Sequence, residues 1–162
     1  MVKEKAQLKI LSLNAEMMAV DKIDMITDFV NRGLPQVIVN RLNDLWDFTK
    51  DIAGEVISIG KIILTKIWEF VKENTNMSIG IVIGVAIGSL VNLIPFLGPL
   101  LSPIAIIIGA IVGGTKGEKL DRLARGEVVS DNEGVIDSLI IMAKKFFHLI
   151  SDIFNTLKTD LT

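Results

Sequence analysis

The chain has 162 residues, of which 50% are hydrophobic and 22% are charged, and its mean hydropathy is +0.52. Its net charge of −2 gives no reason to expect a nucleic-acid partner. With no cysteine and a single histidine, the composition excludes a disulfide framework, a thiolate metal site and a histidine-clustered zinc site. We therefore expect no cofactor, and an enzyme is the least favoured class.

Residues 1–34 have apolar side chains at helical spacing and predict an N-terminal amphipathic helix. Its apolar positions are Leu8, Leu11, Met18, Ile23, Ile26 and Val30. Arg32 and Gly33 form a helix-stop signal after it. The first nine residues alternate charged and apolar side chains, so we do not expect a secretory signal peptide.

Residues 35–76 predict a long amphipathic helix or a pair of helices. Pro35 occupies the favoured first-turn position of a helix. An uninterrupted helix here would be about 57 Å long, so we expect a break between Gly54 and Gly60. No strand alternation competes with the helical pattern at any position in the chain.

The hydrophobicity is concentrated in one block, because the 42 residues from Asn74 to Thr115 include no charged side chain. This length suits two short membrane spans rather than one span of about 20 residues. Pro95, Gly98 and Pro99 predict a turn at its centre. We therefore predict a hydrophobic transmembrane hairpin over residues 77–115, with arms at about 77–94 and 99–114.

Small residues recur every four positions on both arms of this predicted hairpin. They are Gly80, Gly84 and Gly88 on the first arm and Ala105, Gly109 and Gly113 on the second. In an antiparallel hairpin centred on the turn, Gly84 would face Gly109. Such stripes allow helix backbones to approach closely in lipid. We expect the stripes to pair within one chain, with pairing between subunits as the alternative.

Asn92 is the strongly polar side chain of the first arm, and Ser89 lies one turn before it. Polar residues at membrane depth are paired, buried or functional. Asn92 either caps the helix near the turn or, with Ser89, is a candidate pore-lining position.

Residues 116–162 predict a charged connector and a C-terminal amphipathic helix. Ser130 and Glu133 have capping-box spacing before the last helix. That helix is apolar over a wide arc, so it needs more than one partner surface. We expect Phe146, Phe147 and Ile150 to take part in assembly, by contacting both their own chain and an adjacent subunit.

No catalytic constellation is visible in the sequence. The glycines lie in an apolar helical pattern and lack the lysine of a phosphate-binding loop. His148 has no cysteine nucleophile or acid near it in sequence and reads as a structural, half-exposed residue.

The run IAIIIGAIVGG from Ile104 to Gly114, followed by KGEKLDRL from Lys116, resembles the second arm of the hydrophobic hairpin of pore-forming colicins and the charged helix after it. The resemblance covers residues 77–125. It implies a helical channel former that keeps its hairpin buried among amphipathic helices before insertion.

These observations predict an all-α, membrane-inserting protein that forms a small homo-oligomeric pore, of the toxin, lysis or defence type. The lipid bilayer and further copies of the chain are its expected partners. Lysines and arginines flank the hairpin and the turn is uncharged, so both ends should stay cytoplasmic, in a bacterial inner membrane, after a soluble form. The alternatives are a membrane-anchored adaptor that binds an unknown protein partner and a soluble helical lipid-binding bundle.

Overall fold

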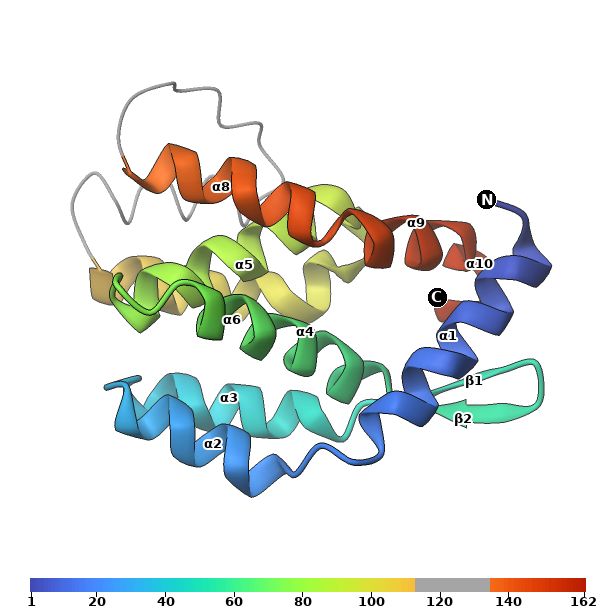
Figure 1. The fold of residues 1–162 in the computed structure, drawn as a ribbon, viewed down its shortest axis with the longest axis horizontal. Helices are drawn as coiled ribbons and strands as arrows, with labels where there is room; N and C mark the ends of the chain where they lie inside the picture. Colours follow the sequence, from blue (N-terminus) through green and yellow to red (C-terminus); the bar gives the residue numbers. More distant parts are fainter. Residues whose placement is uncertain (113–134) are drawn as a thin grey trace. The chain divides into compact units, whose positions relative to one another are not determined.

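The described part of the chain is mostly helical, which confirms the predicted all-α class. The structure, a computed structural model, describes residues 1–112 and 135–162 (Figure 1). The chain divides into two compact units, the first made of Met1–Trp68 with Leu149–Thr162 and the second of Glu69–His148. The second unit is therefore an insertion in the sequence of the first.

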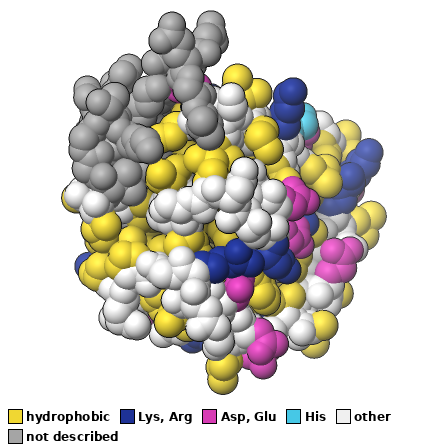
Figure 2. All heavy atoms as spheres, turned by 60° about the vertical axis from the view of Figure 1, so that its left-hand side comes forward, with side chains coloured by type: hydrophobic (Ala, Val, Ile, Leu, Met, Phe, Trp, Pro, Cys, Tyr) yellow, Lys and Arg dark blue, Asp and Glu magenta, His cyan; other side chains and the backbone are white. Residues whose placement is uncertain are grey.

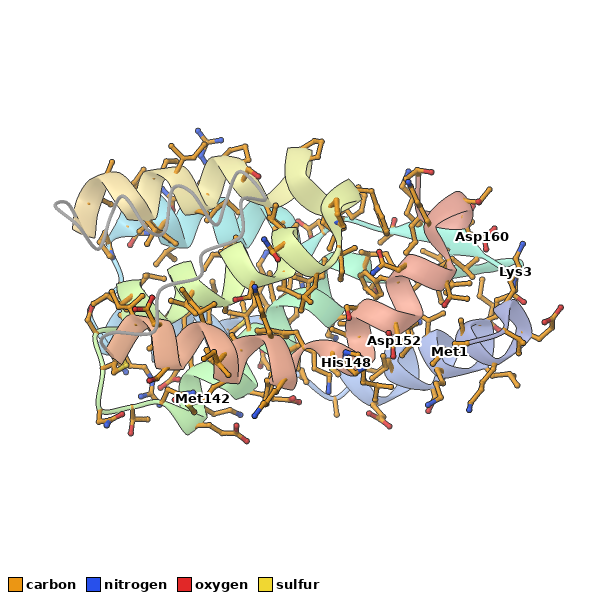
Figure 3. All side chains as sticks on the ribbon, turned by 90° about the horizontal axis from the view of Figure 1, so that it is seen from above. Met1, Lys3, Met142, His148, Asp152 and Asp160 are labelled. Carbon is orange, nitrogen blue, oxygen red and sulfur yellow. The ribbon has the colours of Figure 1, made fainter. Side chains whose placement is uncertain are left out.

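The first unit contains short amphipathic helices and one small β-hairpin. Its elements are α1 (Lys3–Met17), α2 (Lys22–Asn31), α3 (Gln36–Trp46), β1 (Lys50–Ile52), β2 (Glu55–Ile57), the first part of α4 (Ile59–Glu73), most of α9 (His148–Thr156) and α10 (Lys158–Leu161). One apolar face of each long helix is buried, as with Ile10 of α1, Phe29 of α2 and Leu42 of α3. An ion pair joins the exposed Lys3 to the half-buried Asp160 at 3.7 Å (Figure 3).

The N-terminal segment forms two helices, so the prediction of a single helix over residues 1–34 is wrong. α1 ends at Met17 and α2 begins at Lys22. The break occurs because the Asp21 side chain accepts a hydrogen bond from the Ile23 N–H at 2.9 Å and caps a new helix. The predicted stop is confirmed: Gly33 has φ +93°, and the Leu34 N–H donates to the Phe29 carbonyl at 3.0 Å.

The segment 35–76 is a pair of helices, α3 and α4, and its break contains a β-hairpin that the sequence analysis did not expect. β1 and β2 are antiparallel, with Lys50 opposite Ile57. Ala53 and Gly54, at φ +53° and +83°, make the tight turn between them. Three-residue strands are too short to show alternation, which explains why the hydrophobic pattern missed them.

Gly60 allows the start of α4 to lie directly against the end of α3. A Cβ at this position would overlap the Leu45 carbonyl group and lie 3.3 Å from the Phe48 nitrogen. The Gly60 N–H donates to the Phe48 carbonyl at 2.9 Å. A glycine at position 60 is therefore a requirement of the α3–α4 packing.

The second unit is built around α5 (Ile79–Leu93), which contacts both α6 (Gly98–Val112) and α8 (Val135–Phe146). A short 3₁₀ turn, η1 (Pro95–Leu97), connects α5 to α6. Viewed as in Figure 3, α5 lies between α6 and α8. Of these three helices, the one in the middle, α5, is the most completely buried.

The predicted last helix is also interrupted. α8 ends at Phe146 and α9 begins at His148, with Phe147 in a turn between them, and α10 follows after Leu157. The predicted charged connector, which begins at residue 116, and the capping box at Ser130 and Glu133 lie outside the described residues.

Candidate functional site: an uncharged helical hairpin

The most distinctive part of the structure is the hairpin formed by α5, η1 and α6, which confirms the predicted pair of helices and the turn between them. Each helix has 15 residues, or about 22 Å at 1.5 Å per residue. Neither contains a charged side chain. The two helices of the hairpin are therefore uncharged from one end to the other.

α5 is buried on every side. All of its residues from Ile81 to Val91 are buried, and Val82, Ile83 and Ala86 have no exposed surface. An ordinary surface helix has one polar face toward water. α5 has none, so its whole circumference requires an apolar environment.

The turn between the two helices is set by its prolines. Ile94 leaves the helical conformation at φ −129° and ψ 77°, as expected of a residue before proline. Pro95 starts the 3₁₀ turn, and the Leu97 N–H donates to the Ile94 carbonyl at 2.9 Å. Gly98 and Pro99 then occupy the first turn of α6. The predicted turn residues therefore reverse the chain as expected.

α6 has two apolar faces of different exposure. Its buried face includes Leu101, Ile104, Ala105 and Ile108. Its outer face, defined here as Pro99, Pro103, Ile106 and Ala110, is exposed at steps of three and four residues. Ile106 is 45% exposed and Ile111, beside that face, is 50% exposed. Figure 2 shows hydrophobic side chains gathered on one face of the molecule. Exposed apolar faces are typical of interaction sites.

The small-residue stripes lie mostly on buried positions of the hairpin. Gly84, Gly88, Ala105 and Gly109 are buried and Gly80 is half-buried. Gly113 lies outside the described residues. The burial is what close packing of α5 and α6 requires. The register that places Gly84 opposite Gly109 stays a prediction.

Two polar side chains of α5 differ in their surroundings. Ser89 is completely buried, and its hydroxyl has no hydrogen-bond partner among the described residues. Asn92 is half-buried near the turn and has an interaction partner. A buried hydroxyl without a partner is destabilising by about 1–3 kcal/mol. Ser89 is thus poorly matched to the environment in which α5 is buried here.

α8 packs on α5 and is anchored by an aromatic cluster. The rings of Phe146 and Phe147 lie 5.4 and 5.5 Å from that of Phe70, at the end of α4. The Phe146 and Phe147 rings meet edge to face at 5.1 Å. The expected contact of Phe146 with its own chain is therefore confirmed, and contact with an adjacent subunit stays a prediction. Ile150, the third predicted assembly residue, is 4% exposed and lies in the first unit.

None of the described helices is long and apolar enough to cross a membrane. No group of three or more histidine, cysteine, aspartate or glutamate side chains in residues 1–112 and 135–162 could hold a metal ion.

Sequence reasoning missed two features outside the hairpin. His148 is exposed, and an acid, Asp152, follows it by four residues on α9, so the interpretation that no acid lies nearby in sequence is wrong (Figure 3). The outer face of α8 also carries exposed Ile141 and Met142 beside Lys145. In the sequence, the available signal for this outer face of α8 was the pair Lys144 and Lys145 at the end of an apolar helical run.

Comparisons with known proteins leave the function to be argued from this geometry. No protein-family model, curated protein or solved structure matches the chain at a significant level.

Proposed function

We propose that this is a membrane-inserting helical protein that keeps α5, the first helix of the hairpin, buried in its own interior and assembles, after insertion, into a homo-oligomeric pore. The single observation that carries the proposal is the burial of the uncharged helix α5 on all of its sides. In this proposal the protein is not an enzyme, and its principal partners are the bilayer and further copies of the chain.

The composition of the hairpin supports transfer into lipid. A charged side chain at the bilayer centre is costly, and neither α5 nor α6 carries one. The outer face of α6 likewise offers no polar side chain to water. Both helices can therefore exchange protein contacts for lipid contacts at low cost.

The length of the helices limits the mode of insertion. A hydrocarbon core is about 30 Å thick, whereas 15-residue helices span about 22 Å. Extension of the first helix over the uncharged segment 77–94 would bring it to about 27 Å. The remaining mismatch can be met by local thinning of the bilayer, at a modest cost per ångström.

Two short helices cannot enclose a conduit, so conduction requires several subunits. In such an assembly Ser89 and Asn92 are the candidate pore-lining positions, because a water-filled path would satisfy the Ser89 hydroxyl that has no partner in the described residues. The resemblance of residues 77–125 to the colicin hairpin favours the same function. Lysines and arginines on both sides of the uncharged segment favour cytoplasmic ends, in a bacterial inner membrane.

Reconstitution into liposomes tests the proposal. We expect the protein to release small ions, and Asn92→Asp and Asn92→Lys to shift the permeability ratio of cations to anions in opposite directions. Asn76→Lys is the matched control, because Asn76 is exposed and precedes α5. Liposomes that bind the protein yet stay tight under all pH values and voltages would contradict the pore and leave membrane anchoring, the adaptor function, in its place.

A further inference from the structure

α8 has a second, outward-facing surface that the packing of α5 does not use. The buried residues of α8 are Ile136, Asp137, Leu139, Ile140 and Ala143. Phe147, in the turn that follows α8, is also buried. Between them, Ser138, Ile141, Met142 and Lys145 are exposed and Lys144 is half-buried. We define the α8 outer face as Ile141, Met142, Lys144 and Lys145. These four residues fall within five consecutive positions and so share about one turn of helix.

The apolar part of this face is exposed to solvent. Ile141 is 52% exposed and Met142 is 50% exposed. Met142 is marked in Figure 3. Lys145 follows Ile141 by four residues and Met142 by three, so the three residues are neighbours on the helix surface. Two large apolar side chains are thus bordered by a cationic edge.

The charge of the face has one sign. Neither Lys144 nor Lys145 forms an ion pair with any residue in the described part of the chain. The acid of α8, Asp137, is only 4% exposed and does not contribute to the outer face. α1 differs, because its exposed side combines Lys3 and Lys5 with Glu4 and Glu16. The α8 outer face therefore complements a negatively charged surface.

We infer that the α8 outer face binds the headgroup region of an anionic lipid bilayer. In this arrangement Ile141 and Met142 enter the boundary between headgroups and acyl chains, and the two lysines lie at the level of the lipid phosphates. Helices that lie at a membrane interface combine an apolar insertion with lysines in this way. Each lysine near an anionic membrane surface strengthens binding by about five-fold.

The binding face has a direct connection to the hairpin. α8 packs against α5, so binding of its outer face would hold the uncharged hairpin next to the bilayer. Displacement of α8 toward the lipid would uncover α5. This inference rests on the proposed function in that both require a membrane, but the binding step can be measured without any pore.

Vesicle co-sedimentation tests the inference. The probes are vesicles of phosphatidylcholine alone and vesicles that also contain about 30 mol% phosphatidylglycerol, the anionic lipid. We expect the protein to bind the anionic vesicles more tightly than the neutral ones. The double variant Lys144→Gln and Lys145→Gln should lower the affinity for the anionic vesicles by approximately 25-fold. A similar loss of affinity is expected at about 1 M salt, where charges are screened beyond about 3 Å.

Lys5→Gln with Lys9→Gln is the matched control, because these two lysines of α1 are also one exposed and one half-buried. We expect it to bind as the unmodified protein does. Equal losses in both double variants, or none in the α8 variant, would overturn the inference. A second pair, Ile141→Gln with Met142→Gln, should reduce binding to both types of vesicle, and unchanged binding would also overturn it.

Measurement of ion release in the same samples separates the two proposals. Binding that depends on Lys144 and Lys145 without ion release would support the lipid-binding face and contradict the pore. Ion release that is insensitive to the α8 variants would support the pore and contradict the lipid-binding face.

Discussion

The first unit and the α5–α6 hairpin are held together in different ways. In the first unit, specific polar contacts join segments that are distant in sequence. Asn14 of α1 accepts from the Ser58 N–H at 2.9 Å, and the Trp68 indole N–H donates to Asp28 at 2.8 Å. In the hairpin, apolar faces pack without a charged residue, and the Ser89 hydroxyl in α5 lacks a partner among the described residues.

The difference teaches which part of the molecule can change its surroundings. A hydrogen bond stabilises the folded state by about 1 kcal/mol when both partners are present. A buried polar group that has lost its partner destabilises the folded state by more than that. Apolar packing is non-directional, and a lipid tail can take the place of a side chain. We therefore expect the first unit to tolerate little change in its contacts and the hairpin to tolerate a change of apolar environment.

Gly60→Ala should give the largest effect on the first unit. The new Cβ would overlap the Leu45 carbonyl group, and the backbone must move, with an expected loss of about 3 kcal/mol or more in the free energy of unfolding. Gly98→Ala is the matched control, because its Cβ would lie 3.8 Å from the Ser102 hydroxyl, an ordinary contact. Urea denaturation measures both variants, and equal losses would show that the α3–α4 contact is not the cause.

Bulk on the buried side of α6 should disrupt the hairpin. Gly109 is buried and Ala110 is exposed, so Gly109→Leu should destabilise by about 2–3 kcal/mol and Ala110→Leu by less than about 0.5 kcal/mol. Gly84→Leu should act like Gly109→Leu, whereas Ile83→Leu should not. Cysteines introduced at Gly84 and Gly109 should crosslink within one chain, and crosslinks found only between chains would show that the stripes pair between subunits.

Truncation of one polar side chain in each region, half-buried in the first unit and buried in the hairpin, sharpens the comparison further. Asn14→Ala leaves the Ser58 N–H without its acceptor and should destabilise by about 1–2 kcal/mol. Ser89→Ala removes a hydroxyl that has no partner in the described residues and should leave the stability unchanged or raise it slightly. Thermal unfolding distinguishes these outcomes. A large loss for Ser89→Ala would reveal a contact that the hairpin needs.

The β-turn provides the smallest expected effect. Ala53 has a φ of +53°, a region that non-glycine residues rarely adopt. Ala53→Gly should therefore stabilise by about 0.5–1 kcal/mol, after allowance for the greater freedom of glycine in the unfolded chain. Gly54→Ala, at φ +83°, should lower the free energy of unfolding. A loss for Ala53→Gly would mean that the turn is not strained.

Local sequence signals predicted the elements whose cause is local. The uncharged run and the prolines at 95 and 99 identify the hairpin and its turn, because proline restricts the backbone at its own position. The β-hairpin was missed because its strands are three residues long. Such short strands form through packing, here of β1 with α10 and of β2 with α1, which no local pattern encodes.

The candidate site could be predicted only in outline. The stripe residues Gly84 and Gly109 were identifiable from spacing, and both are buried. The exposure of Ile106 and Met142 could not be predicted, because both helices are apolar over wide arcs and the covered side depends on tertiary packing. The breaks after Met17 and Phe146 were missed because helical periodicity continues across them.

The discontinuity of the first unit has a consequence for biosynthesis. That unit needs Leu149–Thr162 as well as Met1–Trp68, whereas α5, η1 and α6 are contiguous in the chain and make only local contacts with one another, which form early. At a rate of synthesis of about 5–20 residues per second, the hairpin would leave the ribosome seconds before α8 and Leu149–Thr162. During that interval the 42-residue uncharged stretch is without its covering helix, so chaperones and the translocation machinery have their first opportunity to engage the nascent chain there.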